Sequence, residues 1–247
     1  MSFEILDPTG KHAVVTGGAS GIGAAIAQAL AARGARVSVI SRSEHSTQWF
    51  SAQADVADEG QVKRAFALAR ETNGPISLLV NNAGVARSAP LLRTSVELWD
   101  RILATNLRGA FLCTRAAVPD MFEAKCGSIL NVASTAGLGG EAYLSAYCAS
   151  KHGLVGFTRA LAAEFSGSGV TANAICPGYT ETRMLEQAID NVAKFTGATR
   201  EAARERLAQS NPQGRIATLE EVADAAIALL IGTRTGIAVV IPGGSEA

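Results

Sequence analysis

Short runs of β-branched and apolar residues alternate along this chain with longer segments of helical periodicity. Strands are expected at residues 13–16, 37–41, 76–80, 129–132, 170–175 and 238–241, and one more ends over residues 53–56. Helices are expected at residues 22–33, 59–71, 95–121 and 147–165. Because parallel strands need right-handed crossovers, this alternation predicts an α/β fold with one doubly wound parallel sheet of about seven strands and helices on both faces.

Length and composition fit one domain spanning residues 1–247, because the chain has no internal repeat, low-complexity tract or linker-like segment. Lys plus Arg and Asp plus Glu both number 22, so the net charge of zero gives no general attraction to nucleic acid or to an anionic membrane. We see neither a secretory signal nor an apolar run of the ~18 residues that a membrane span requires. A soluble, cytoplasmic protein is expected.

The cysteines and histidines are not spaced like metal ligands, and the chain has no CxxC pair. These residues are Cys113, Cys126, Cys148, Cys176, His12, His45 and His152. Core packing is the expected role of the thiols, and no metal site is predicted.

The connection between the second and third expected strands is short, since only residues 42–50 join them. A whole strand–helix–strand crossover takes at least about 10–12 residues, so at most one or two helical turns fit there. Trp49 and Phe50 are expected to cover apolar surface that a full helix would otherwise shield. Residues 231–236 form a second short connection, before the last strand.

A glycine-rich turn follows the first expected strand and precedes the first expected helix. It reads TGGASGIG from Thr16 to Gly23. Glycine permits positive φ and lets backbone N–H groups approach a phosphate, which would also face the positive end of the helix. A purely structural tight turn is the alternative, but this placement favours dinucleotide binding. The candidate residues are Gly17, Ala19, Ser20, Gly21, Ile22 and Gly23.

The end of the second strand bears on the choice of dinucleotide. An acidic residue there would accept hydrogen bonds from the adenosine ribose, whereas a basic one would pair with a 2′-phosphate. The chain has Ser41 and Arg42 at this point and no carboxylate. Because guanidinium groups suit bidentate contact with phosphate, NADP(H) is favoured and NAD(H) is the second choice. A solvated surface arginine is the alternative interpretation of Arg42.

Tyr147 and Lys151 lie four residues apart at the start of an expected helix and therefore share one helix face. A nearby ammonium lowers the pKa of a phenol, normally near ~10, so that the phenol can exchange a proton with a carbonyl or carbinol oxygen during hydride transfer. Ser134 ends the fifth strand, where its hydroxyl can bind the oxygen that gains charge. A Tyr–Lys pair alone would more often be a surface pair; Ser134 makes the set specific.

Six ordered motifs together resemble the short-chain dehydrogenase/reductase family. They are TGGASGIG, NNAG, Asn106 within ATNLRGAF, Ser134, YCASK and PGYTET. The resemblance runs from about Lys11 to Gly244. It implies a Rossmann domain, an NAD(P)-dependent oxidoreductase, and assembly as a homotetramer or dimer.

The resemblance also implies roles for individual residues. Tyr147 would be the general acid/base, and Lys151 would lower its pKa and bind the nicotinamide ribose. Ser134 would position the substrate oxygen, and Asn106 would support a water that relays protons to Lys151. Further cofactor contacts would be Asp55 and Val56 at the adenine, Asn82, Ala83 and Gly84 along the groove, and Pro177, Gly178, Thr180 and Thr182 at the carboxamide. Alternative roles are a strand-end turn for Asp55, sheet stabilisation for Asn82 and a loop or cap for Thr182.

Residues 181–211 interrupt the strand–helix alternation and form the expected lid over the substrate. The lid's apolar positions have helical spacing, which also fits ordinary packing of a helix pair. The expected substrate contacts are Leu138, Glu141, Tyr143, Met184 and Leu185. The lid arginines, such as Arg200 and Arg204, fit either an acyl-carrier phosphate or a solvated helix face.

The leading functional hypothesis is reversible NADP(H)-linked reduction of a ketone, such as a 3-oxoacyl thioester. The alternatives are an NAD-linked dehydrogenase of a small alcohol, sugar or hydroxy acid, and a non-catalytic NADP-binding regulator. The complete set of Ser134, Tyr147 and Lys151 counts against the regulator.

Overall fold

A computed structural model describes residues 6–43 and 48–241 of the chain. Within them, seven parallel strands form one sheet in the order β3-β2-β1-β4-β5-β6-β7. The strands are β1 (His12–Thr16), β2 (Arg36–Ser41), β3 (Phe50–Gln53), β4 (Ile76–Asn81), β5 (Gly127–Val132), β6 (Val170–Pro177) and β7 (Ala238–Ile241). The expected doubly wound parallel sheet is confirmed. Its order reverses between β1 and β4, and ligands bind at such reversals, beyond the carboxyl ends of the strands.

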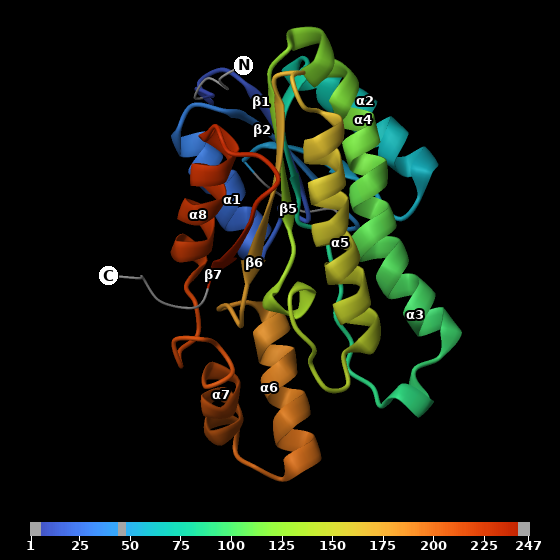
Figure 1. Cartoon of the computed structure of the whole chain (residues 1–247), viewed down its shortest axis with the longest axis vertical. Helices are drawn as coiled ribbons and strands as arrows, with labels where there is room; N and C mark the ends of the chain where they lie inside the picture. Colours follow the sequence, from blue (N-terminus) through green and yellow to red (C-terminus); the bar gives the residue numbers. More distant parts are fainter. Residues whose placement is uncertain (1–5, 44–47, 242–247) are drawn as a thin grey trace.

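Helices cover both faces of the sheet (Figure 1). α1 and α8 pack together on one face, and α2, α4 and α5 lie on the other. Their bounds are α1 (Gly21–Ala32), α2 (Glu59–Asn73), α3 (Val96–Leu103), α4 (Gly109–Ala124), α5 (Ser145–Glu164), α6 (Arg183–Thr196), α7 (Arg200–Ala208) and α8 (Leu219–Ile231). α6 and α7 extend past the sheet, at the bottom of Figure 1, and occupy most of the expected lid segment.

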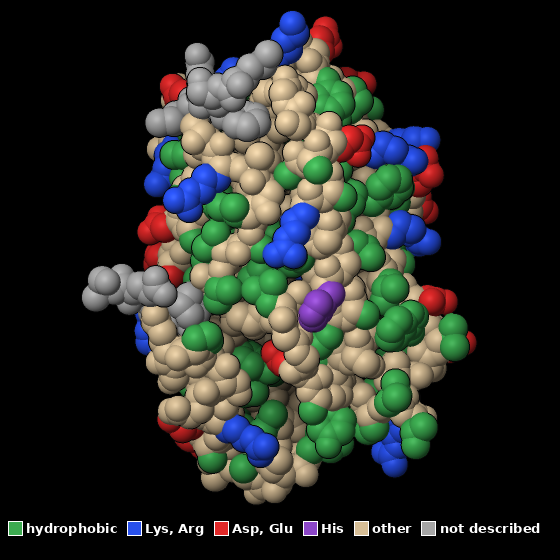
Figure 2. Space-filling view, viewed as in Figure 1, with side chains coloured by type: hydrophobic (Ala, Val, Ile, Leu, Met, Phe, Trp, Pro, Cys, Tyr) green, Lys and Arg blue, Asp and Glu red, His purple; other side chains and the backbone are tan. Residues whose placement is uncertain are grey.

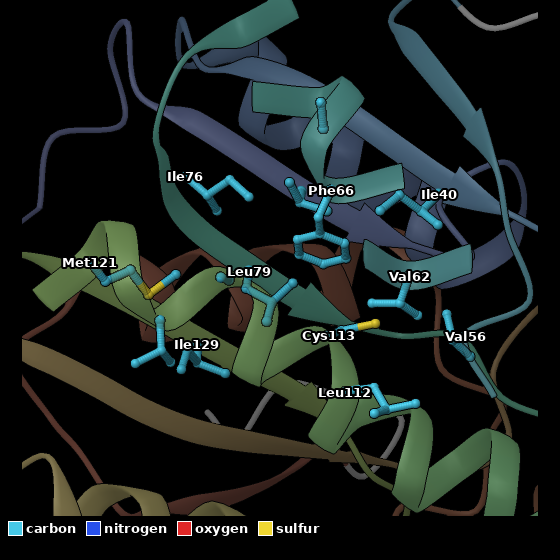
Figure 3. Close-up of a cluster of buried hydrophobic side chains, with 14 of the residues drawn as sticks. Ile40, Val56, Val62, Phe66, Ile76, Leu79, Leu112, Cys113, Met121 and Ile129 are labelled. Atoms are coloured by element: carbon cyan, nitrogen blue, oxygen red, sulfur yellow. The ribbon is translucent and has the colours of Figure 1, made fainter. Parts of the chain in front are cut away.

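Two apolar clusters join the sheet to its helices. The cluster beneath α2 and α4 includes Phe66, Met121 and Ile129, all fully buried (Figure 3). The cluster beneath α1 and α8 includes Ile26 and Leu30. Burial of these two faces holds the strand ends, and the loops that follow them, in fixed positions.

The third strand lies earlier than expected. β3 begins at Phe50 and ends at Gln53, because its residues pair with Ser38 to Ser41 of β2, after which the chain leaves the sheet. Val56 lies outside the strand and packs closely against Gly109 at the start of α4. Of residues 53–56, which were expected to end this strand, only Gln53 belongs to β3.

The crossover from β2 to β3 is short, as expected. Its described residues (42, 43, 48 and 49) form bends and no helix, and residues 44–47, including His45, lie outside the described residues. Trp49 packs against the apolar cluster beneath α1, and Phe50 packs against the cluster beneath α2. The two aromatic residues thus cover opposite faces of the sheet edge. The family resemblance extends to Gly244, and residues 242–244 also lie outside the described residues.

The helix expected over residues 95–121 is interrupted. α3 is followed by a π-helical turn, Ala104–Arg108, and then by α4, which contains Pro119 and continues to Ala124. The π-helical turn places Asn106 within the helical segment, where its side chain can leave the regular helix surface.

Candidate active site

The glycine-rich turn leaves the start of α1 open to an anion. The Ser20 side chain makes no capping hydrogen bond and the first turn of α1 contains no acidic residue. By contrast, side-chain oxygens cap α2, α3, α6, α7 and α8. The N–H groups at the start of α1 are therefore available, and together with the helix dipole they suit a phosphate.

Close packing explains why this turn needs glycine. Gly17 and Gly21 have positive φ, at 64° and 53°. A Cβ on Gly23 would lie 2.4 Å from Asn82 Nδ2 and 2.5 Å from the Gly17 oxygen. Ala19 and Ile22 are partly buried against the cluster beneath α1. The residues present therefore fit the pyrophosphate of a dinucleotide.

Asn82 ties the end of β4 to the glycine-rich turn. Its Nδ2 donates hydrogen bonds to the Thr16 oxygen (2.9 Å) and the Gly17 oxygen (3.2 Å). The backbone N–H groups of Asn82 and Ala83 both donate to Thr16 Oγ1 at 3.0 Å. The side chain of Asn82 is thus occupied in joining two strands, which favours the sheet-stabilising interpretation.

Two of the candidate adenosine residues, Arg42 and Asp55, line a cavity of about 610 Å³, together with Arg64. Arg42 is exposed and forms no salt bridge with any described acidic residue. Asp55 Oδ1 accepts a hydrogen bond from the Ala57 N–H (2.9 Å), and Ser41 Oγ donates to the Ser43 oxygen (2.7 Å). Arg64 is likewise exposed and forms no salt bridge with a described acidic residue, so both guanidinium groups that line the cavity lack such a partner.

Ser134 and Tyr147 meet at the carboxyl end of β5. Ser134 directly precedes the short helical turn Thr135–Gly137, and its Oγ accepts a hydrogen bond from the Ala136 N–H (3.2 Å). Tyr147 lies in the first turn of α5, near enough to the Ser134 side chain for Ser134 to lower the pKa of the phenol. Burial raises the pKa of Tyr147 to about 12, the Ser134 hydrogen bond opposes this rise, and the Glu141 carboxylate adds to it.

Lys151 lies behind Tyr147 and is almost fully buried, with 5% of its surface exposed. Its Nζ donates a hydrogen bond of 2.7 Å to the Val132 oxygen and lies 5.7 Å from the centre of the Tyr147 ring. Burial lowers the pKa of Lys151 to about 8. The pKa of Tyr147 is raised in this structure because burial of the phenol outweighs the lowering by Ser134. The lowering by Lys151 that the family resemblance implies stays a prediction.

Asn106 extends the network away from Lys151. Its Nδ2 donates to the Val85 oxygen (2.9 Å) and to Ser150 Oγ (3.0 Å), and its Oδ1 accepts from the Val85 N–H (2.8 Å). Ser150 Oγ in turn donates to the main-chain oxygen of Tyr147 (2.7 Å), one turn earlier in α5. A Cβ on Gly84 would lie 3.4 Å from Asn106 Oδ1 and 3.7 Å from Lys151 Nζ, so these groups meet at one point.

The candidate carboxamide residues follow β6, which ends at Pro177. Thr180 Oγ1 donates to the Gly178 oxygen (3.1 Å). Thr182 caps α6 by accepting from the Leu185 N–H (3.3 Å), and its Cγ2 would lie 3.4 Å from a Cβ on Gly21. Thr182 therefore combines the cap role with a position against the glycine-rich turn.

Sequence reasoning missed Asn211, which anchors this loop. Its Oδ1 accepts from the Tyr179 N–H (2.8 Å), and its Nδ2 donates to the main-chain oxygens of Tyr179 (2.9 Å) and Arg215 (2.6 Å). Only 3% of Asn211 is exposed. No local pattern indicates this role, because the contact joins residues more than thirty positions apart in the chain.

The candidate substrate residues divide into three exposed and two sheltered side chains. Leu138, Tyr143 and Met184 are exposed. Glu141 is half-buried and accepts a hydrogen bond from Tyr179 Oη (3.3 Å). Leu185 is buried in a cluster shared by α6 and α7, which favours ordinary helix packing for that residue.

The lid arginines are paired within the lid. Arg200 forms ion pairs with Glu186 and Asp190, and Arg204 forms ion pairs with Glu181 and Glu186. These contacts link α6 to α7. The solvated-face interpretation of Arg200 and Arg204 is thereby favoured over contact with an acyl-carrier phosphate.

In the described part of the chain, no group of three or more potential ligands could hold a metal ion. None of the described helices is long and apolar enough to cross a membrane. The four cysteines are free, and Cys113, Cys148 and Cys176 are buried.

Comparisons with known proteins agree with this geometry. Residues 11–193 match the family model described as short chain dehydrogenase. The chain is 39% identical to a D-beta-hydroxybutyrate dehydrogenase of Cupriavidus necator, over 89% of this chain and 90% of the relative. It is 40% identical to a D-threitol dehydrogenase of Mycolicibacterium smegmatis, over 89% and 85% of the two chains.

Among solved structures, the chain is similar to an actinorhodin polyketide ketoreductase with NADPH. The TM-score is 0.89 at 35% identity, covering 95% of this chain and 96% of the other. The chain therefore belongs to the short-chain dehydrogenase family and is an oxidoreductase that interconverts secondary alcohols and ketones by NAD(P)-dependent hydride transfer.

Proposed function

We propose that this enzyme reduces a ketone with NADPH, reversibly, and that Ser134, Tyr147 and Lys151 perform the proton transfer. The observation that carries the proposal is that Tyr147 lies beside both Ser134, which lowers its pKa, and the buried Lys151, whose Nζ lies 5.7 Å from the centre of its ring. A ketone oxygen held by two hydroxyl groups is polarised for hydride attack.

The chemistry that a bound nicotinamide supplies here is hydride transfer. Tyr147 donates the proton that the ketone oxygen takes up, and Ser134 holds that oxygen in place. After Tyr147 has donated its proton, Lys151 supplies a new one to the phenolate. Asn106 supports this proton relay. Its lowered pKa, about 8, makes the ammonium a ready proton donor near neutral pH.

The preference for NADP(H) is supported by Arg42. Its exposed guanidinium lies beside the cavity lined by Asp55 and has no described acidic partner, so it is available to a 2′-phosphate. The pyrophosphate would lie at the start of α1, and Thr180 and Thr182 would hold the carboxamide. One similar solved structure is a ketoreductase with NADPH, which is consistent with this assignment.

A 3-oxoacyl thioester is the proposed substrate class, since the ketoreductase is a close structural relative. The exposed apolar side chains among the candidate substrate residues, Leu138, Tyr143 and Met184, suit contact with an acyl chain. The second candidate is a small polyol or other alcohol. It is favoured by the similarity to a D-threitol dehydrogenase and by the polar Glu141–Tyr179 pair at the site.

The test is a panel of 3-oxoacyl thioesters, simple ketones and polyols, each measured by nicotinamide absorbance with NADPH or NADH and with the oxidised forms. We expect ketone reduction with NADPH to be fastest. The Tyr147→Phe variant should bind NADPH with an affinity within about threefold of wild type and lose turnover by roughly 10²–10⁴-fold. Appreciable turnover by this variant would refute the acid/base role.

We further propose that the whole chain works as one domain with residues 181–211 as its lid, in the cytoplasm, as a homo-oligomer. Four free cysteines fit a reducing compartment. Exposed apolar side chains gather over α3 and α4 (Figure 2), among them Val96 and Phe111, and such surface is commonly covered by another subunit. Light scattering of the purified enzyme would distinguish a tetramer from a dimer or a monomer.

A further inference from the structure

Glu141 and Tyr179 join two loops that follow the carboxyl ends of β5 and β6. Glu141 lies in the loop between the Thr135–Gly137 turn and α5, and Tyr179 lies in the loop after β6. The Tyr179 Oη donates a hydrogen bond of 3.3 Å to Glu141 Oε2. The ring of Tyr179 also packs against the apolar cluster of α6 and α7. The carboxylate is therefore held between the catalytic loop and the base of the lid.

Glu141 lies in the loop that joins Ser134 to Tyr147, between the Thr135–Gly137 turn and the start of α5. After burial, its negative charge is a main cause of the raised pKa of both Tyr179 and Tyr147. Within the described residues, no Lys, Arg or His forms a salt bridge with Glu141. The unneutralised negative charge of Glu141 would therefore act on a substrate bound at Ser134 and Tyr147.

We propose that Glu141, positioned by Tyr179, is a specificity-determining residue that selects uncharged ketones and rejects substrates with a carboxylate next to the reacting carbonyl. This inference rests on the proposed function. A 3-oxo acid carries its carboxylate two bonds from the ketone carbon. When Ser134 and Tyr147 hold the ketone oxygen, that carboxylate must lie within a few ångströms of the site and faces a like charge in partly desolvated surroundings.

This selectivity would distinguish the enzyme from one of its relatives by the charge of the substrate. A D-beta-hydroxybutyrate dehydrogenase is named for a substrate that is a carboxylate, whereas a threitol or a thioester has no charge beside the reacting carbon. An uncharged substrate hydroxyl would instead find both an acceptor and a donor in the Glu141–Tyr179 pair. The site is thus suited to neutral 3-oxo esters, thioesters and polyols.

The experiment compares methyl 3-oxobutanoate with 3-oxobutanoate, which differ in the charge beside the ketone. For wild type we expect kcat/KM for the ester to exceed that for the acid by at least ~100-fold. Glu141→Gln keeps an acceptor for Tyr179 and removes the charge, so the ester-to-acid ratio should fall at least ~10-fold, mainly through a lower KM for the acid. The matched control, Glu97→Gln on α3, should leave this ratio within about threefold of wild type.

Equal use of the two substrates by wild type, or an unchanged ratio in Glu141→Gln, would overturn the proposal. A binding measurement keeps it separate from the proposed function. In Tyr147→Phe protein saturated with NADPH, cofactor fluorescence reports the Kd of each compound without turnover, and adding Glu141→Gln should reduce the ester-to-acid affinity ratio at least ~10-fold. Absence of all ketone turnover would refute the proposed function, whereas the binding ratio alone would still decide the role of Glu141.

Discussion

Lys151 donates a hydrogen bond from Nζ to the main-chain oxygen of Val132, at 2.7 Å, across the space between α5 and β5. The contact places an ammonium group in a site that is almost closed to water. Burial lowers its pKa to about 8, from 10.5 for an exposed lysine. Burying the charged ammonium therefore destabilises the folded protein at neutral pH, but it places a proton donor next to Tyr147.

Replacing Lys151 with methionine should stabilise the cofactor-free protein. A pKa shift from 10.5 to about 8 corresponds to roughly 3 kcal/mol against the charged form at pH 7, partly offset by about 1–2 kcal/mol for the lost hydrogen bond. We expect the free energy of unfolding of Lys151→Met to exceed that of wild type by about 1–2 kcal/mol at pH 7 in urea.

The pH dependence of this difference identifies its cause. The folded-state pKa is below the unfolded one, so between about pH 8 and 10.5 the folded protein binds fewer protons than the unfolded chain. Wild-type stability therefore gains from Lys151 as the pH rises through this window, and the advantage of the variant should shrink. Lys63→Met, on the exposed face of α2, should show no such trend. An advantage that is constant with pH would rule out the buried charge as its source.

Two helical glycines should respond in opposite directions to substitution by alanine. A Cβ on Gly23 would lie 2.4 Å from Asn82 Nδ2, whereas a Cβ on Gly156, in α5, would have nothing within 4 Å. We expect Gly23→Ala to cost about 1–3 kcal/mol by overpacking and to weaken NADPH binding at least ~10-fold. Gly156→Ala should gain up to about 1 kcal/mol from helix propensity.

Thermal unfolding and fluorescence titration with NADPH measure both effects on the same samples. The two variants differ mainly in whether the new Cβ has room, because each substitution adds one methyl group inside a helix. If Gly23→Ala bound NADPH as wild type does, the close packing of the turn against Asn82 would not matter for the cofactor.

Much of this site could be predicted from sequence because its parts are local. The spacing from Tyr147 to Lys151 follows from the helix period, and the glycine-rich turn between β1 and α1 has a local conformational requirement. The position of Ser134 follows from the rule that functional residues follow parallel strands. These features need no knowledge of distant contacts.

The parts that could not be predicted depend on distant contacts. Tyr179 and Asn211 are 32 residues apart and meet only when the chain returns from the lid. The register of β3 is set by its pairing with β2, so that Val56, although apolar, leaves the sheet and packs against α4. The pKa of Tyr147 depends on the balance between burial and neighbouring groups, and spacing alone gives only one side of that balance.

Replacement of Arg42 with alanine should reduce the preference of the enzyme for NADPH. If the guanidinium binds the 2′-phosphate, the ratio of kcat/KM for NADPH to that for NADH should fall at least ~10-fold, because charge-assisted bonds contribute about 1.5–3 kcal/mol. Lys63→Ala removes a positive charge from the exposed face of α2 and serves as the control for general electrostatic attraction. An unchanged ratio in Arg42→Ala would show that another group selects the cofactor.

Asn211 should control the stability of the lid. Its side chain makes hydrogen bonds with the N–H and the oxygen of Tyr179 and with the oxygen of Arg215, and it is buried. Asn211→Ala would leave the Tyr179 N–H without this partner in a sheltered position, although the Tyr179 oxygen also accepts from the Ala217 N–H (2.9 Å). Because one main-chain donor loses its partner, we expect a cost of about 1–3 kcal/mol.

The site of that loss can be located. Hydrogen exchange should accelerate at the Tyr179 amide and through α6 and α7, since those helices return to the sheet beside Asn211, while amides of β1 and β4 keep their wild-type protection. Substrate KM should rise more than cofactor Kd, because the lid and Glu141 meet through Tyr179. Gln209→Ala, at the end of α7, removes an exposed amide without touching Tyr179 and is the matched control. Equal acceleration in β1 and α6 would mean that Asn211 supports the whole fold and has no particular part in holding the lid.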